Sequence, residues 1–343
     1  MAIALSSAYL VPSVAIAQSL PTPFVGRLVD PVFLRGIEDV HLEGDYAFLP
    51  CREGKRLTIC SIEDPANPEV VSSFTHPDLD QATGLAFNGN TLYLNSLRNH
   101  RLLVLDATDK SAVRLLGSVT VGEPGTEGVL YKVAYRDGYC YAALQNEKRL
   151  FIVDVRDARR PVVVGSVVVT TEDDGPFSVL LRDNYALTGT LFGSRNRLAV
   201  VDVEDPANPR LVSQVLDPVI TVVSGTVVGD FYFAASSYRN ALLVFDIADP
   251  ANPKLAAKLV DNRLIMPNRC VASGDRAYLP LGQGGDGVAV VNIADPRKPK
   301  FLTSFRDPVM KKAYGVALRG DLLFVGARDG NSLVVLDRRK LEQ

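Results

Sequence analysis

One apolar segment with a polar end returns seven times along this 343-residue chain, at intervals of 44 to 48 residues. Clear copies read RLLVLD, RLFIVD, RLAVVD and ALLVFD, and the residues that end the seven copies are Ser61, Asp106, Asp154, Asp202, Asp246, Asn292 and Asp337. A fixed interval of this size is typical of proteins whose similar units pack side by side and bury apolar faces against one another. The chain is therefore expected to form one array of seven units.

A second pattern precedes each apolar segment: an apolar stretch, a tight polar turn and an aromatic-rich stretch. GLAFNGNTLYLN (residues 84–95) and GTVVGDFYFAAS (residues 225–236) are examples. The central Gly-Asn and Gly-Asp pairs accept the positive φ of hairpin turns. Each unit therefore predicts four short antiparallel strands, which we name A to D in chain order.

The five residues DPANP occur at 64–68, 205–209 and 249–253, and DPRKP at 295–299 is a close variant. Aspartate caps the first position of such a turn, and proline presets φ at the second. The second proline then starts strand D without a backbone donor, which suits the outer edge of a sheet. The motif predicts the corner between strands C and D, with strand D outermost.

Seven four-stranded antiparallel units of this period predict an all-β, seven-bladed β-propeller, a single domain over residues 18–343. The last unit stops after its strand C, whereas PTPFVGRLVDP (residues 21–31) is similar to strand D of the other units. We expect this N-terminal strand to complete the last blade and close the ring.

The segments LLVLD, LFIVD, LAVVD, LLVFD and LVVLD, with the DPANP corners, resemble the LVIVD-repeat family from Pro21 to the C-terminus. Units two, three and seven depart from the corner pattern, with DKSAV, DARRP and RRKLE in its place. The resemblance implies a β-propeller, commonly in exported or cell-surface proteins, and it supplies no shared catalytic motif. The absence of tryptophan argues against the WD40 class.

Residues 1–17 form an apolar run that ends in Ala15-Ile16-Ala17, a pattern that signal peptidases accept. We expect a signal peptide and an exported protein in the periplasm, at the cell surface or secreted, although no basic residue precedes Arg27. A buried first strand or helix is the alternative. The segment is too short, and too interrupted by Pro12, to predict a transmembrane span.

Composition narrows the expected partners. The 37 basic and 39 acidic side chains nearly cancel, which gives no support to nucleic-acid binding. The four cysteines and three histidines lack metal-ligand spacing, so no metal or cofactor is expected and the cysteines are interpreted as small buried residues. We expect a monomer.

Candidate ligand-binding residues lie where the chain enters strand A, beside the central channel. Other propellers commonly bind their ligands at this place, so the expectation rests on similarity of fold. Equivalent positions in different units hold carboxylates, cations and tyrosines, which is typical of a polar pocket but equally of channel residues paired with one another. The candidates are Glu38, Asp39, Tyr131, Lys132, Asn268, Arg269 and Tyr314.

Basic residues recur in the B-to-C loops on the same side. This pattern predicts a cationic rim for anionic ligands, or else a repeated residue that only solvates each loop. The rim candidates are Arg52, His100, Arg101, Arg149, Arg197 and Arg239.

The leading functional hypothesis is a non-catalytic module that binds a protein or a small anionic or carbohydrate ligand. The alternative is a hydrolase or lyase acting on an anionic or sugar-like substrate. There Glu38 or Asp39 would be the general base, and Lys132 and Arg269 would stabilise negative charge. A scaffold role is third. Convergence of these four residues on an open cavity favours a small ligand or substrate, whereas a plugged channel favours a protein partner.

Overall fold

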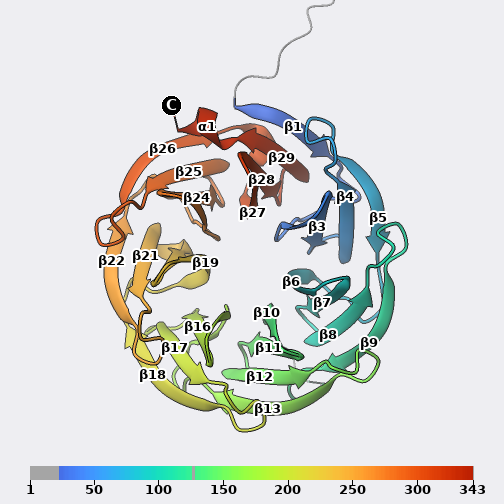
Figure 1. The fold of residues 1–343 in the computed structure, drawn as a ribbon, viewed down its shortest axis with the longest axis vertical. Helices are drawn as coiled ribbons and strands as arrows, with labels where there is room; N and C mark the ends of the chain where they lie inside the picture. The colour runs from blue at the N-terminus through green and yellow to red at the C-terminus, as the bar shows by residue number, and fades with distance from the viewer. Residues whose placement is uncertain (1–22, 126–127, 343) are drawn as a thin grey trace, which may run out of the picture.

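A computed structural model describes residues 23–125 and 128–342, and in this part of the chain seven antiparallel sheets form a ring of blades (Figure 1). The predicted all-β seven-bladed propeller is confirmed. The predicted signal peptide, residues 1–17, lies outside the described residues. No described helix is both long and apolar enough to cross a membrane.

The first three blades follow the predicted A-to-D order. Blade 1 consists of β2 (His41–Glu43), β3 (Tyr46–Cys51), β4 (Arg56–Ser61) and β5 (Glu69–Phe74). Blade 2 consists of β6 (Ala82–Asn88), β7 (Thr91–Ser96), β8 (Arg101–Asp106) and β9 (Arg114–Thr120). Blade 3 consists of β10 (Leu130–Arg136), β11 (Tyr139–Leu144), β12 (Arg149–Asp154) and β13 (Val162–Val168).

Blade 4 differs from the others because its inner strand is interrupted. It consists of β14 (Gly175–Pro176), β15 (Leu180–Arg182), β16 (Tyr185–Leu191), β17 (Arg197–Asp202) and β18 (Arg210–Leu216). Both β14 and β15 pair with β16, and the backbone N–H groups of Phe177 and Ser178, which lie between them, both donate to the carbonyl of Gly189. Two short strands, β14 and β15, therefore replace the single strand A that the sequence predicts.

The last three blades return to four strands each. Blade 5 consists of β19 (Val222–Val228), β20 (Phe231–Ser236), β21 (Ala241–Asp246) and β22 (Lys254–Val260). Blade 6 consists of β23 (Val271–Ser273), β24 (Arg276–Leu281), β25 (Gly287–Asn292) and β26 (Lys300–Arg306). Blade 7 consists of β27 (Ala313–Arg319), β28 (Leu322–Ala327), β29 (Ser332–Asp337) and β1 (Phe24–Val29). Three one-turn helices accompany them: η1 (Ser237–Arg239), η2 (Pro308–Met310) and α1 (Arg338–Leu341).

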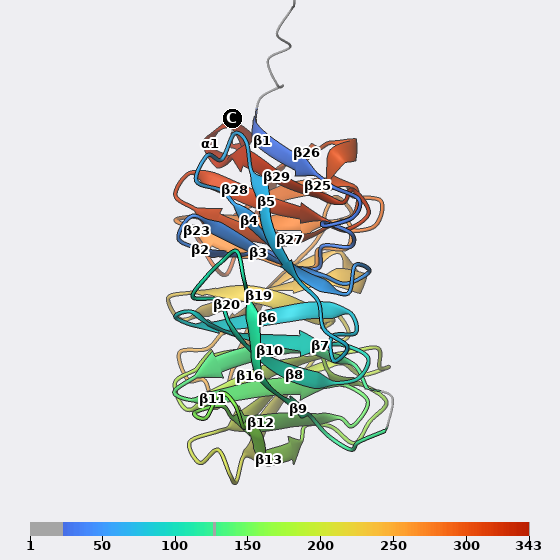
Figure 2. The ribbon, with the colours of Figure 1, turned by 90° about the vertical axis from the view of Figure 1, so that its right-hand side faces the viewer.

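The N-terminal strand β1 closes the ring as predicted. It runs antiparallel to β29, from Phe24 opposite Leu336 to Val29 opposite Ser332, so the two ends of the chain share one sheet. The Phe24 ring is buried and packs edge-on against Phe305 of blade 6, with ring centroids 5.4 Å apart. Figure 2 shows β1 beside β29 at the same end of the molecule as the C-terminus.

The DPANP corner has the predicted geometry. Asp64 Oδ1 accepts a hydrogen bond from the Ala66 backbone N–H at 3.0 Å, and Asp64 Oδ2 accepts one from the Asn67 side chain at 2.8 Å. The copy at Asp205 makes the same two bonds. In the seventh unit, α1 replaces the corner, and Asp337 at the end of strand C accepts from the Arg339 N–H, as the equivalent Asp202 does from the Glu204 N–H.

The corners have a second role that the sequence does not reveal, because several of them pack against strand D of the preceding blade. Ser72 of blade 1 donates to the Lys110 carbonyl at the blade 2 corner at 2.6 Å, and Ser213 of blade 4 donates to the Ala251 carbonyl at the blade 5 corner at 2.6 Å. At Gly165 of blade 3, an added Cβ would overlap the Pro206 carbonyl oxygen. These corners are therefore contacts between blades.

We expect substitutions at Gly165 to destabilise the ring in proportion to size. Gly165→Ala is expected to lower the free energy of unfolding by about 1–3 kcal/mol, and Gly165→Val by more, because the Pro206 carbonyl cannot move without shifting its corner. Ser213→Ala is the matched control, since a Cβ is already accommodated there; it should cost only about 1 kcal/mol for the lost hydrogen bond. Urea unfolding measures all three, and equal losses would contradict the packing argument.

The cores lie between neighbouring blades, and the cysteines belong to them. Cys51, Cys60, Cys140 and Cys270 are all buried and free, as predicted. Burial raises the pKa of the Cys51 thiol to about 12, which leaves it protonated and unreactive at neutral pH.

Candidate functional site

The candidate residues lie where the regular strand pairing of strand A is interrupted or has not yet begun. In blades 1 and 6, strand A begins only at His41 and Val271, and the preceding segments touch strand B through the isolated bridges Ile37–Cys51 and Pro267–Leu281. In blades 3 and 7, β-bulges interrupt the register at Leu130/Lys132 and Ala313/Gly315. Because bulges redirect side chains, this irregularity allows the candidates to reach across the channel.

Asp39 of blade 1 is the centre of the candidate site. Its Oδ2 lies 2.7 Å from Lys132 Nζ of blade 3 and 3.0 Å from His41 Nε2, and its Oδ1 lies 2.6 Å from Arg269 Nε of blade 6. Asp39, Lys132 and Arg269 are all buried. Three blades that are distant in sequence are thus joined through one carboxylate.

Glu38 extends this cluster on the other side. The Tyr131 hydroxyl donates to Glu38 Oε1, Arg328 Nη1 lies 3.5 Å from Glu38 Oε2, and Arg269 Nη2 donates to the Glu38 backbone carbonyl at 2.8 Å. Arg328 also forms an ion pair with Glu53. We name Glu38, Asp39, Tyr131, Lys132 and Arg269 the channel plug.

Burial and charge act in opposite directions on the titratable groups of the plug. Burial raises the pKa of Glu38, and nearby arginines offset only part of this effect. Burial would also raise the pKa of Asp39, but the charges of Arg269 and Lys132 outweigh it and hold that pKa well below its usual range. Burial lowers the pKa of Lys132 to about 8, with a further contribution from Arg269, against the opposing effect of Asp39.

The two remaining candidates lie beside the plug without joining it. Asn268 is buried, and its side-chain amide donates to the Met266 carbonyl at 2.9 Å. Tyr314 is half-buried, with the Arg328 guanidinium 5.3 Å from its ring centroid. Both general bases of the enzyme alternative, Glu38 and Asp39, are buried and already bonded.

Two of the five arginines of the predicted cationic rim form ion pairs with described residues, and two others bond neutral side chains. Arg101 lies 2.9 Å from Asp78, and buried Arg197 lies 3.0 Å from Asp174. The other contacts are Arg52 to Gln81 at 3.0 Å, Arg149 to Ser166 at 2.8 Å and His100 to the Val121 carbonyl at 2.6 Å. Arg239 is exposed. These acidic and polar partners come mainly from the D-to-A connections and strands D, which the sequence argument did not consider.

An exposed apolar surface, which the sequence analysis missed, lies on the loops of blades 4 and 5. The Phe192 and Tyr238 rings are 58% and 53% exposed, with centroids 5.8 Å apart. Leu216 and Val260, at the ends of strands D in the same blades, are 52% and 58% exposed. We name Phe192 and Tyr238 the aromatic patch. The sequence signal for this surface was an aromatic residue in the B-to-C loop of blade 4 and another in that of blade 5.

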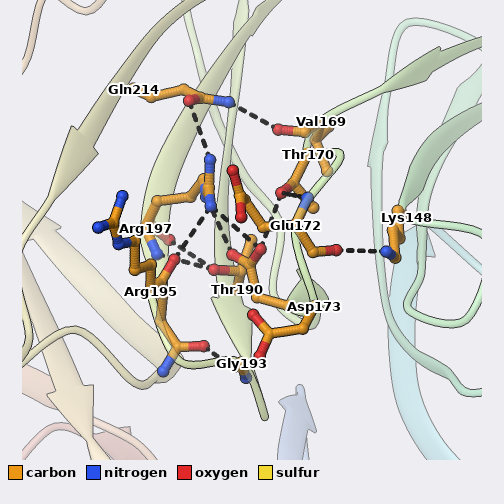
Figure 3. A network of polar contacts seen from close by, with 12 residues as sticks. Lys148, Val169, Thr170, Glu172, Asp173, Thr190, Gly193, Arg195, Arg197 and Gln214 are labelled. Atoms are coloured by element: carbon orange, nitrogen blue, oxygen red, sulfur yellow. Dashed lines mark hydrogen bonds and ion pairs between the residues drawn. The ribbon is translucent and has the colours of Figure 1, made fainter.

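The loop that carries Phe192 is held by a buried polar network (Figure 3). The Arg197 guanidinium bonds Asp174, Gln214 and the Arg195 carbonyl, and Thr170 donates to Asp174 at 2.8 Å. The Gly193 and Ser194 N–H groups, which directly follow Phe192, are bonded by Asn196 and Asp173. Phe192 itself has a φ of 68°, a conformation that non-glycine residues rarely adopt. The loop therefore holds an exposed aromatic ring although the backbone conformation at that residue is unfavourable in free energy.

Comparisons with known proteins agree with this architecture. The LVIVD repeat family model matches residues 36–76, 128–169, 178–217 and 225–260, which lie in units one, three, four and five. The chain is a β-propeller with LVIVD repeats. No curated protein matches it in sequence.

Solved structures that are similar to this LVIVD-repeat propeller have low sequence identity to it, so the similarity concerns the fold alone. A chain from the crystal structure of the Mitotic Checkpoint Complex has a TM-score of 0.70 at 9% identity, over 96% of this chain and 99% of that one. Kuenenia stuttgartiensis Hydrazine Synthase has a TM-score of 0.69 at 12% identity, over 90% and 97%. The WD40 β-propeller domain of Doa1 has a TM-score of 0.66 at 10% identity, over 91% and 95%.

A metal centre is not formed by the part of the LVIVD-repeat propeller that the structure describes. Within that part, no three or more His, Cys, Asp or Glu side chains are grouped so as to hold an ion. The acidic side chains of the plug instead accept bonds from lysine, arginine and tyrosine. The chemistry available at the channel is thus ion pairing and hydrogen bonding.

Proposed function

We propose that this protein is an exported, non-catalytic binding module that binds a protein partner through the aromatic patch on its loop face. The observation that carries the proposal is the exposed Phe192–Tyr238 pair, in which the loop of Phe192 is held by the buried Arg197–Asp174 ion pair. Exposed aromatic side chains that lie together are typical of protein interaction sites. Aromatic side chains that are already fixed lose little entropy on binding.

The charge around the patch indicates the chemistry of the partner. Arg195 and Arg239 are exposed and lie within three residues of Phe192 and Tyr238 respectively. A partner segment with apolar anchors flanked by carboxylates would complement this surface. The channel plug also favours a protein over a substrate, because the two proposed general bases, Glu38 and Asp39, are buried and already bonded within it. Export is supported only by the apolar run of residues 1–17.

A random-peptide display screen on the purified protein tests this proposal. Selected peptides are expected to combine aromatic or aliphatic residues with Asp or Glu. Phe192→Ala/Tyr238→Ala should raise their Kd at least tenfold, or about 1.4 kcal/mol, because the apolar anchors lose their contacts. Val162→Ala/Leu302→Ala is the matched control, since these residues are also exposed but lie on strands D away from the patch.

Two results would count against the proposal. Peptides that bind the patch variant as tightly as the unchanged protein would place binding elsewhere, and a screen without enrichment would contradict a peptide-binding loop face. Circular dichroism confirms that both double variants remain folded, which is expected because all four side chains are exposed.

A further inference from the structure

Strand β13 of blade 3 is an outer edge strand without a charged side chain. It reads VVVGSVV and lies at the end of its sheet, on the outside of the ring (Figure 1). Val162 and Val168, at its two ends, are exposed. The outermost strands of the other blades, β1, β5, β9, β18, β22 and β26, each contain a lysine, arginine or glutamate. Charges on an edge strand discourage pairing with another chain, and β13 lacks this protection.

The blade 4 corner covers one face of β13 and leaves its backbone edge uncovered. Ser72 of β5 and Ser213 of β18 bond the corner that follows them, but the equivalent residue of β13 is Gly165, which has no side chain to do so. The Pro206 carbonyl of the blade 4 corner lies on the side of Gly165 to which a Cβ would point. Among the described residues, no backbone hydrogen bond joins β13 to this corner. One row of N–H and C=O groups of β13 is therefore open to another strand.

A cavity of about 760 Å³ lies against the other face of β13, between this strand and β9 of blade 2. Val163 and Ser166 of β13 line it, and the residues that add apolar surface are Val119, Phe151 and Pro161. Two carboxylates and one guanidinium also line the cavity, those of Glu123, Glu147 and Arg149. Side chains of a strand added at the β13 edge would alternate between this cavity and the blade 4 corner.

We infer that β13 binds an extended segment of a protein partner, which adds to blade 3 as a further strand. The segment pairs with Gly165–Val168, beyond the register shift at Ile152/Val153. Its backbone hydrogen bonds supply affinity, and its alternate side chains supply specificity: apolar ones enter the cavity, and small ones pass the blade 4 corner. A basic residue at one end complements the two carboxylates of the cavity. The site lies on blade 3, so it does not depend on the interaction proposed for the aromatic patch.

Fluorescence anisotropy of the full chain with labelled peptides tests the inference. The probes are Lys-Thr-X-Thr-X-Thr-Lys, in which X is Val, Ile, Leu or Phe, and at least one is expected to bind with a Kd below about 1 mM. Each binding peptide is then made in two N-methylated forms, one methylated at the X residues and one at the threonines. Only one row of peptide N–H groups faces β13, so one form should bind about tenfold more weakly than the other.

Ser166→Lys places on β13 the charge that Lys258 supplies at the equivalent position of β22, so the strand should still fold. We expect it to raise the Kd of the peptides about tenfold. Ser304→Lys is the matched control, because it makes the same exchange at the equivalent position of β26 in blade 6. This control and Phe192→Ala/Tyr238→Ala should both leave peptide binding unchanged.

Four results would overturn the inference. Absence of binding by every peptide at about 1 mM would exclude this ligand class. Equal affinity of the two N-methylated forms would exclude strand pairing, and unchanged affinity in Ser166→Lys would place the peptides elsewhere on the protein. Sedimentation velocity of the unchanged chain supplies the fourth: dimers that Ser166→Lys abolishes would mean that a second copy, rather than a partner, occupies the β13 edge.

Discussion

Asp39→Ala is expected to lower the free energy of unfolding by about 3–5 kcal/mol, because it leaves two buried cations without their counter-ion. Lys132 Nζ and Arg269 Nε lie 2.7 and 2.6 Å from this carboxylate, and both side chains are buried. The loss should appear in urea unfolding of the purified variant. Since Asp39 joins blades 1, 3 and 6, amide exchange should also increase at the inner strands of all three.

The control for Asp39→Ala is an ion pair with similar geometry on the surface. Arg210 lies 2.7 Å from Asp202 but is largely exposed, so Arg210→Ala should cost no more than about 1 kcal/mol. Adding Lys132→Met to Asp39→Ala should recover part of the loss, because one unpaired charge disappears. A loss below about 1 kcal/mol for Asp39→Ala alone would show that the plug is solvated rather than buried.

The pH dependence of this contribution follows from the direction of the Asp39 pKa. The folded pKa is held below the unfolded value of about 3.9. The contribution is therefore fully present above about pH 4 and is lost only as the pH falls through the lower folded pKa. Between these values the unchanged protein should lose stability relative to Asp39→Ala.

The sequence predicted the ring because the features that make it are local and repeated. Apolar segments that end at Asp106, Asp154 or Asp202 define strand C, and the Asp64–Pro68 turn defines the corner that follows it. Closure followed from one further comparison, the similarity of residues 21–31 to strand D. Packing of corners on neighbouring blades was not predicted, because it depends on which residue faces Gly165 across a blade boundary.

The candidate site was predicted only as a set of positions. That Asp39 would bond Lys132 and Arg269, rather than leave them open to a ligand, depends on bulges and shortened strands that shift each side chain across the channel. These irregularities depart from the repeat, so a reading based on the repeat cannot locate them. The carboxylate partners of two rim arginines, Arg101 and Arg197, were missed for a similar reason, since Asp78 and Asp174 come from connections that vary between units.

Phe24→Ala is expected to lower the free energy of unfolding by about 3–5 kcal/mol, the usual cost of removing a buried phenylalanine. The Phe24 ring is buried between blades 6 and 7 and packs against Phe305. Its strand β1 is the only described strand of blade 7 that comes from the N-terminal part of the chain. Weakening it exposes the edge of β29 and opens the ring, so we expect exchange to rise throughout β29 and increased aggregation.

Phe33→Ala provides the matched control for closure, because Phe33 lies a few residues after β1 and is partly exposed. Removing the Phe33 ring should lower the free energy of unfolding by about 1 kcal/mol or less, including the loss of its contact with the Arg56 guanidinium. Equal effects of the two substitutions would mean that β1 is a replaceable outer strand. A large difference, with amide exchange in β29 raised only by Phe24→Ala, would mean that this one N-terminal side chain controls closure. The reason is that a closed ring, unlike an open stack of repeats, has one blade that the two ends of the chain must complete together.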